Sequence, residues 1–185
     1  FASAWDTGSL RIMMNVFDMP FIKIPSALIT YKPLLEACEE WESPIILSTG
    51  MSTPKMIDEA IDILSKERIY CIMHCTSTYP TDPEEINARY ILALRKRYPW
   101  AKIGFSNHYP GLMAMALAVA FGAEMLEFHV TLDRSMYGSD QAASIEPQGI
   151  FRLKEYVKLI AQMKGDGIKK IYDSEQPIIS KLRRQ

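Results

Sequence analysis

The chain has 185 residues, a formal net charge of −1, and 48% hydrophobic and 23% charged residues. This length and composition are typical of one folded domain with a hydrophobic core. The near-neutral charge argues against nucleic acid or an anionic membrane as the main partner, and no apolar run reaches the ~18 residues of a membrane span. The three cysteines, Cys38, Cys71 and Cys75, show no disulfide spacing, so we expect reduced thiols in a cytoplasmic protein.

Short, almost continuous apolar segments alternate with amphipathic ones along the chain. Such apolar segments are typical of parallel strands that are covered on both faces. We expect strands at 21–25, 44–48, 69–75, 103–106 and 125–130, with 1–4 as a further candidate. Helices are expected at 9–17 and 33–41, after the N-cap Thr53, after Asp82-Pro83, at 112–121 and after Pro147.

This alternation predicts either a doubly wound sheet or a barrel. No glycine-rich phosphate loop follows any expected strand, which weakens the nucleotide-binding alternative. Hydroxyl side chains end nearly every expected strand, and a barrel brings all of its strand ends to one mouth. We therefore expect a (β/α)8 TIM barrel at 1–165, a partial one with about six βα units that lacks the first two strands. Residues 166–185 are interpreted as a linker, and the chain as part of a longer protein.

Two histidines lie at the ends of neighbouring expected strands. His108 follows the strand at 103–106, His129 lies late in 125–130, and a helical stretch joins the two strands. A strand–helix–strand unit places the carboxyl ends of its strands at the same edge of a parallel sheet. Although a lone histidine there is more often structural, the pair predicts a divalent metal site. His74, which precedes Cys75 inside a strand, is interpreted as structural.

Small hydroxyls and one lysine occupy the other strand ends. These residues are Ser3, Lys23, Ser26, Ser48, Ser77 and Ser106. Hydroxyls donate hydrogen bonds and an ammonium group supplies compensating charge, so the set is suited to holding a phosphate. Any one serine is more often a turn residue, and the prediction depends on their combination.

Four motifs carry a family resemblance. They are Lys-Ile-Pro-Ser from Lys23, Ile-Leu-Ser-Thr-Gly-Met from Ile46, His-Cys-Thr-Ser-Thr-Tyr-Pro from His74, and the segment 132–147 with its Tyr-Gly-Ser-Asp and Glu-Pro. In this order and spacing they closely resemble the sialic acid synthases, which comprise the N-acetylneuraminate synthases and their legionaminate and pseudaminate relatives. The resemblance covers nearly the whole chain.

The resemblance implies a TIM-barrel enzyme that condenses phosphoenolpyruvate with N-acetylmannosamine or a related N-acetylated hexosamine and releases phosphate. It assigns the phosphoenolpyruvate pocket to Ser3, Lys23, Ser26, Ser48, Ser77 and Ser106. It makes His108 and His129 ligands of Mn²⁺ or Mg²⁺, with Glu127 as their acidic catalytic neighbour, and Tyr79 and Asp140 contacts of the sugar. It also implies a homodimer, in a family whose members usually carry a further C-terminal antifreeze-like domain.

Two other interpretations remain open from the sequence. One is a related enzyme, such as another phosphoenolpyruvate–sugar synthase, a legionaminate or pseudaminate synthase, or a class II metal aldolase. The other is a catalytically incomplete fragment that binds substrate or a partner without turnover. Many bacterial relatives carry Asp where this chain has Asn107 and His where it has Gln141, which bears on the identity of the sugar.

Overall fold

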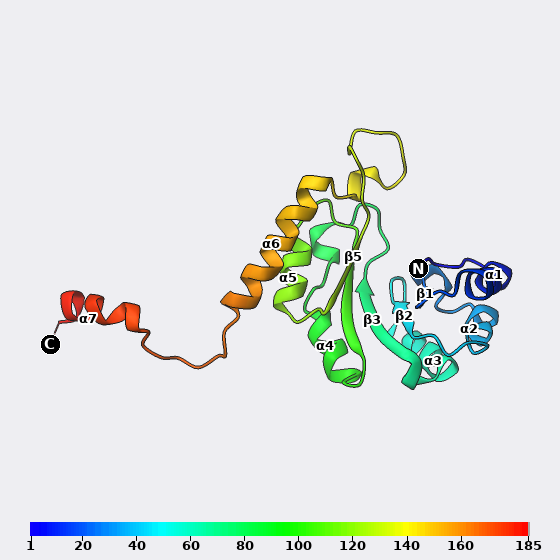
Figure 1. Cartoon of the computed structure of the whole chain (residues 1–185), viewed down its shortest axis with the longest axis horizontal. Coiled ribbons are helices and arrows are strands. Elements are labelled where there is room, and N and C mark those ends of the chain that lie inside the picture. The colour runs from blue at the N-terminus through cyan, green and yellow to red at the C-terminus, as the bar shows by residue number, and fades with distance from the viewer. Residues whose placement is uncertain (185) are drawn as a thin grey trace.

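The computed structural model describes residues 1–184, which form a curled, parallel half-barrel (Figure 1). Its five strands are neighbours in chain order from β1 to β5. They are β1 (Ile22–Ile24), β2 (Ile45–Ser48), β3 (Ile69–Cys75), β4 (Lys102–Asn107) and β5 (Met125–Phe128). The expected α/β class and partial barrel are therefore confirmed. Because all strands are parallel, their carboxyl ends lie together at one rim.

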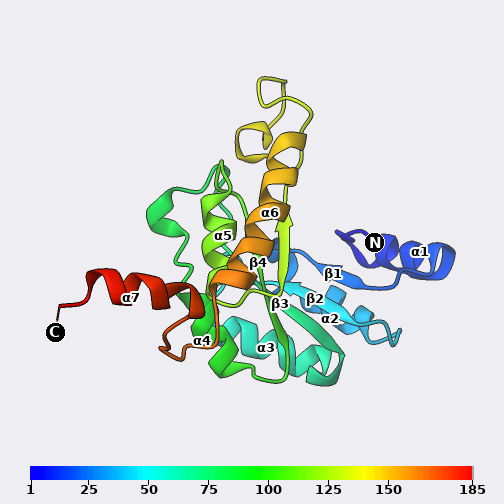
Figure 2. The ribbon, with the colours of Figure 1, turned by 60° about the vertical axis from the view of Figure 1, so that its left-hand side comes forward.

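Helices α1 to α6 alternate with the strands and cover the outer face of the sheet, whereas α7 lies apart from it. They are α1 (Thr7–Phe17), α2 (Lys32–Cys38), α3 (Pro54–Leu64), α4 (Tyr90–Arg97), α5 (Met113–Ala120), α6 (Pro147–Met163) and α7 (Gln176–Leu182). Figures 1 and 2 show α5 and α6 side by side on the half of the sheet formed by β4 and β5. No helix within residues 1–184 has the length and apolar character needed to cross a membrane.

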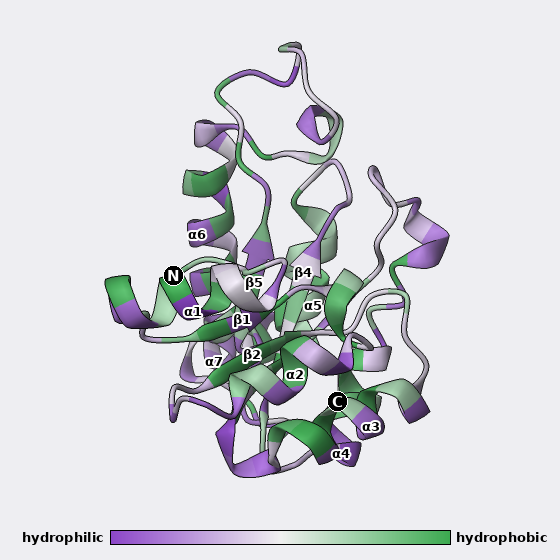
Figure 3. Ribbon diagram, turned by 90° about the vertical axis from the view of Figure 1, so that its right-hand side faces the viewer, coloured by the Kyte–Doolittle hydropathy of each residue, from purple (hydrophilic) through white to green (hydrophobic). Residues whose placement is uncertain are grey.

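The apolar residues form two layers. Ile45, Leu47 and Ile72 belong to the main core between the sheet and the helices, whereas Ile46 and Met73 belong to a small cluster on the concave face. Successive side chains of a strand point to opposite faces, which explains this division. In Figure 3, β1 and β2 are drawn largely in the hydrophobic colour. The concave face is thus apolar at its base, and its polar residues are concentrated toward the carboxyl rim.

Two local expectations, at residues 1–4 and after Asp82, differ from the structure. Residues 1–4 contribute only an isolated bridge between Ser3 and Lys23. The helix expected to begin at Asp82-Pro83 is a 3₁₀ turn, Pro83–Glu85, and α4 begins only at Tyr90. Asn87, whose φ is 41°, lies between them and interrupts the helical backbone. Residues 166–184, which belong to the segment expected to be a linker, include α7, which Figure 1 shows apart from the barrel, and the role of this segment as a linker stays a prediction.

Gly104 of β4 allows close packing on the concave face, and its replacement by alanine is expected to destabilise the fold. An added Cβ would lie 2.2 Å from Sδ of Met73 and 3.0 Å from the carbonyl oxygen of Met125. Met73 is fully buried, so it has little room to move. We expect a loss of about 1–3 kcal/mol in unfolding free energy, measured by urea denaturation. Gly8→Ala, in the exposed first turn of α1, is the control, and an equal effect there would contradict this account.

Candidate active site

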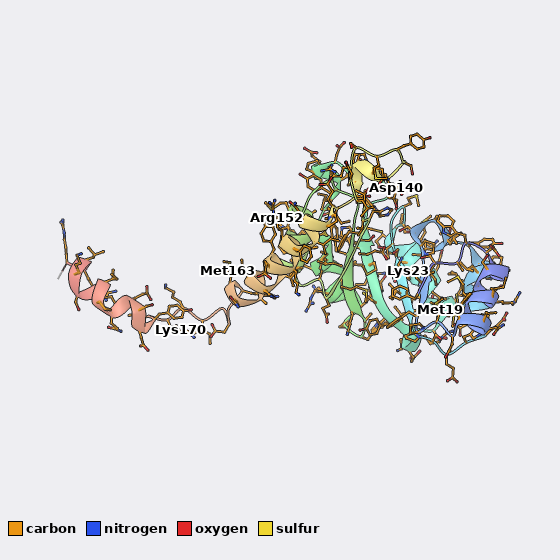
Figure 4. The ribbon with its side chains drawn as sticks, turned by 45° about the horizontal axis from the view of Figure 1, so that its top comes forward. Met19, Lys23, Asp140, Arg152, Met163 and Lys170 are labelled. Carbon is orange, nitrogen blue, oxygen red and sulfur yellow. The ribbon has the colours of Figure 1, made fainter. Side chains whose placement is uncertain are left out.

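A cleft of about 570 Å³ opens at the carboxyl rim of the sheet. Its lining comprises Ser3, Trp5, Lys23, Pro25, Ser26, Ala27, Ser48, Met51, Ser77, Tyr79, Ser106, His108, Glu127, His129 and Asp140. Every site residue predicted from the sequence is in this list. Figure 4 labels Lys23, from β1, and Asp140, from the loop after β5. The structure therefore brings the predicted residues together from opposite ends of the half-barrel, while their individual roles stay predictions.

Lys23 places a positive charge in the wall of the cleft. Its side chain is only 6% exposed, and its Nζ donates a hydrogen bond to Ser48 Oγ at 2.6 Å. Glu127 Oε2 lies 3.5 Å from Nζ, and Glu127 Oε1 accepts a hydrogen bond from Ser106 Oγ at 2.8 Å. A buried ammonium group needs a compensating anion. Glu127 supplies one here, and because its side chain is 41% exposed it can also exchange with water or a ligand.

Two serine hydroxyls line the wall beside Lys23. Ser26 Oγ accepts the Gly50 N–H at 2.9 Å. Ser77 Oγ is buried and has no hydrogen-bond partner among the described residues. Buried hydroxyls in folded proteins are almost always paired, so the partner of this one is an ordered water or a ligand atom. Together with Lys23, these groups are suited to an anionic oxygen.

The two predicted metal-binding histidines lie on the opposite wall of the cleft. Their ring centroids are 5.4 Å apart, and Tyr79 packs against both rings at 4.1 Å from His108 and 5.6 Å from His129. His108 Nδ1 lies 2.6 Å from the Thr76 carbonyl oxygen, so Nδ1 carries the hydrogen and Nε2 keeps its lone pair. Burial lowers the pKa of His108, which favours the neutral imidazole that a metal requires.

The second predicted metal ligand, His129, lies beside a carboxylate. His129 Nδ1 lies 3.3 Å from Asp140 Oδ2, and both side chains are partly exposed. Within residues 1–184 no three His, Cys, Asp or Glu side chains converge as a finished metal cage. Two imidazoles, one oriented by a backbone carbonyl, nevertheless fit a divalent ion that keeps open positions for water or substrate. The residues present therefore fit the expected Mn²⁺ or Mg²⁺, whose binding stays a prediction.

Comparison with known proteins assigns the family. The model of the NeuB family matches residues 1–169. The chain belongs to the NeuB family, that of the sialic acid synthases. The N-acetylneuraminate-9-phosphate synthase of Drosophila melanogaster is 40% identical over 149 residues, which are 80% of this chain and 40% of that protein. The N,N'-diacetyllegionaminic acid synthase of Campylobacter jejuni is 36% identical over 176 residues, or 93% of this chain and 52% of the relative.

Solved structures agree with this assignment. A sialic acid synthetase from Leptospira borgpetersenii, solved in complex with citrate, superposes with a TM-score of 0.86 and is 33% identical, covering 100% of this chain and 66% of that one. A truncated 3-deoxy-D-arabino-heptulosonate 7-phosphate synthase from Thermotoga maritima, 18% identical with a TM-score of 0.64, shares the fold. The NeuB chain described here spans about half the length of most curated relatives it matches.

Sequence reasoning missed several groups in this NeuB site. Trp5 and Met51 line the cleft, although neither carries obvious chemistry. Thr76 acts through its carbonyl oxygen, and a residue that acts through its backbone leaves no side-chain signal in the sequence. The buried Asn107 donates to the Tyr109 carbonyl oxygen at 2.8 Å and so fixes the turn that carries His108. His74 lies outside this cleft, with Nε2 2.9 Å from the Ile86 carbonyl oxygen, in agreement with its predicted structural role.

Proposed function

We propose that this chain carries the substrate site of a nonulosonate synthase, which joins phosphoenolpyruvate to N-acetylmannosamine or a related acetamido sugar and releases phosphate. Family membership supports the class of reaction. The observation that carries the proposal is the convergence of buried Lys23, the orphaned Ser77 hydroxyl and the His108–His129 pair on one cleft. One wall of this cleft suits an anion, and the other suits a carbonyl group that is polarised by a metal ion.

Phosphoenolpyruvate fits the wall around Lys23. The ligand carries a phosphate and a carboxylate, and both need cationic and hydrogen-bond donor partners. Lys23 Nζ supplies the charge, while Ser26, Ser48 and Ser77 supply hydroxyls in fixed positions. Such preorganised donors orient the ligand before reaction and need no rearrangement as charge develops. Ser3 lies beside them through its bridge with Lys23.

The sugar is assigned to the wall formed by Tyr79, His108, His129 and Asp140. Tyr79 presents an aromatic ring that is 44% exposed, and the Asp140 carboxylate can accept hydrogen bonds from sugar hydroxyls. His108 and His129 would hold the divalent ion, which when bound supplies Lewis-acid polarisation of a carbonyl oxygen. In this proposal the aldehyde carbon of the open-chain sugar lies opposite C3 of phosphoenolpyruvate.

The proposed reaction forms one carbon–carbon bond and one carbon–oxygen bond, and it breaks one carbon–oxygen bond. C3 of phosphoenolpyruvate attacks the aldehyde carbon, whose oxygen takes up a proton, and water adds at C2. The bond from C2 to the phosphate oxygen then breaks as the new C2 hydroxyl becomes a ketone and its proton passes to the departing phosphate. In this proposal Glu127 takes the proton of the added water at Oε2, which lies 3.5 Å from Lys23 Nζ, whereas Oε1 accepts the Ser106 hydroxyl hydrogen. Lys23 stabilises the departing phosphate. The metal and the homodimer implied by the resemblance, and the cytoplasmic location expected from the cysteines, are part of this proposal.

Phosphate release tests the function. We expect phosphoenolpyruvate, N-acetylmannosamine and Mn²⁺ to give inorganic phosphate with a longer chain that contains these residues, and we would assay this chain alongside it. Turnover by the short chain would show that its residues are sufficient for catalysis. Turnover by the longer chain alone would show that the short chain is an incomplete part of the enzyme. Release that continues without any sugar would contradict a condensation.

The identity of the sugar needs a panel, because relatives of comparable identity are named for different products. N-Acetylmannosamine, its 6-phosphate and a 2,4-diacetamido hexose would be compared by kcat/KM at equal phosphoenolpyruvate concentration. Preference for the second or third sugar would keep the synthase class and change its product. Inactivity with the entire panel, in the longer chain and with Mn²⁺ or Mg²⁺ present, would contradict the proposed function.

A further inference from the structure

A buried thiol lies directly behind the anion wall of the cleft. Cys75, the last residue of β3, is 6% exposed, and its Sγ lies 3.1 Å from both Ser26 Oγ and the Gly50 amide nitrogen. The three groups come from three different parts of the chain, namely β3, the 3₁₀ turn Ser26–Leu28 after β1, and the turn after β2. Cys75 therefore ties together the ends of three neighbouring strands at the place where the anion is proposed to bind.

Three groups at this junction can donate a hydrogen, namely the Gly50 amide, the Cys75 thiol and the Ser26 hydroxyl. The single hydrogen of the Gly50 amide is shared between Ser26 Oγ at 2.9 Å and Cys75 Sγ at 3.1 Å, so it occupies one lone pair of each acceptor. Burial raises the pKa of Cys75, so the thiol stays protonated at neutral pH and keeps an S–H to donate. When that S–H fills the second lone pair of Ser26 Oγ, the hydroxyl hydrogen of Ser26 has to point to another acceptor.

The space around Gly50 shows how closely these groups approach the backbone. A Cβ on Gly50 would lie 2.2 Å from Ser77 Oγ and 2.8 Å from Ser26 Oγ. Two hydroxyls therefore face the same turn, and one of them, Ser77 Oγ, has no partner within residues 1–184. A neutral donor at position 75 adds a hydrogen bond here without adding a negative charge that would repel an anion.

We propose that Cys75 is a positioning residue that orients the Ser26 hydroxyl. This inference rests on the proposed function and adds a residue to its phosphoenolpyruvate site. The Cys75 S–H donates to Ser26 Oγ and so directs the Ser26 hydroxyl hydrogen into the cleft, toward an anionic oxygen of phosphoenolpyruvate. Cys75 itself does not touch the ligand. Cys75→Ala removes the orienting bond, whereas Cys75→Ser keeps a donor of similar size.

Calorimetric titration with phosphoenolpyruvate tests this coupling. We expect Cys75→Ala to weaken binding by about three- to tenfold, the effect of one oriented hydrogen bond, and Cys75→Ser to restore most of the affinity. In a Ser26→Ala background, the additional effect of Cys75→Ala should vanish, which a merely structural role would not produce. Cys71→Ala is the matched control, because Cys71 lies on the same face of β3 but contacts Met73 Sδ at 3.4 Å instead of the cleft.

An infrared measurement tests the hydrogen bond without any ligand. The difference spectrum between wild type and Cys75→Ser isolates the S–H stretch of Cys75, and we expect it at a lower frequency than that of a thiol that donates no bond. A band at the free-thiol frequency, or a loss of affinity that persists in the Ser26→Ala background, would overturn the role of Cys75. Wild-type chain that shows the shifted band but does not bind phosphoenolpyruvate would overturn the proposed ligand and, with it, the functional role of the bond.

Discussion

Replacing Lys23 with methionine is expected to weaken phosphoenolpyruvate binding by roughly 100-fold, within the range for loss of a charge-assisted hydrogen bond. Lys23 is the cation of the anion wall, with Nζ 2.6 Å from Ser48 Oγ and 3.5 Å from Glu127 Oε2. Methionine keeps the buried apolar stem and removes the charge. Glu127 then loses its cation and adds negative potential where an anionic ligand must bind.

The change should act on binding more than on folding. Glu127 is 41% exposed, so water can solvate its carboxylate after Lys23 is lost. Phosphoenolpyruvate affinity would be measured by calorimetry and folding by urea denaturation. Lys102→Met is the matched control, because Lys102 begins β4 at the opposite rim and donates to Tyr70 Oη. Unchanged affinity in Lys23→Met, with both variants folded, would contradict the anion-wall assignment.

The strands were predictable because each is a short apolar run that ends at polar residues. β3 matches its predicted range, 69–75, since six of its residues are buried on the two faces of the sheet. β5 ends at Phe128, whereas the prediction extended to residue 130. Val130 instead pairs with Ile145, in the segment that returns toward α6. Strand ends therefore depend on partners far away in the chain, which apolar periodicity does not reveal.

The site was predictable to the extent that topology determines it. Parallel strands bring their carboxyl ends together, so residues at those ends had to become neighbours once the βα alternation was recognised. Their pairings were not predictable. These pairings depend on side-chain rotamers and backbone direction. Examples are the contacts of Glu127 with Ser106 and Lys23, and the hydrogen bond by which the Thr76 carbonyl oxygen orients His108. The family resemblance supplied the expected roles, and these stay predictions until they are measured.

Replacing either His108 or His129 with alanine is expected to weaken Mn²⁺ binding by more than about 100-fold and to remove metal-dependent turnover. Loss of a group that only supports a ligand costs about 10–100-fold in affinity, so loss of a ligand itself should cost more. The two rings lie edge to face with 5.4 Å between their centroids, and His108 is held through Nδ1 by the Thr76 carbonyl oxygen. One remaining imidazole provides no second nitrogen donor for the ion.

The third histidine provides the control, because the chain contains three in all. His74 is buried against Tyr90 and Phe105 and bonds to the Ile86 carbonyl oxygen, away from the cleft. His74→Gln should therefore lower the unfolding free energy and leave Mn²⁺ affinity within about twofold of wild type, since sites without shared partners act independently. Electron paramagnetic resonance of free Mn²⁺ measures the affinities. Wild-type affinity in His108→Ala or His129→Ala would show that the ion is held elsewhere, and the cleft would then have to polarise the sugar aldehyde with its own hydrogen-bond donors.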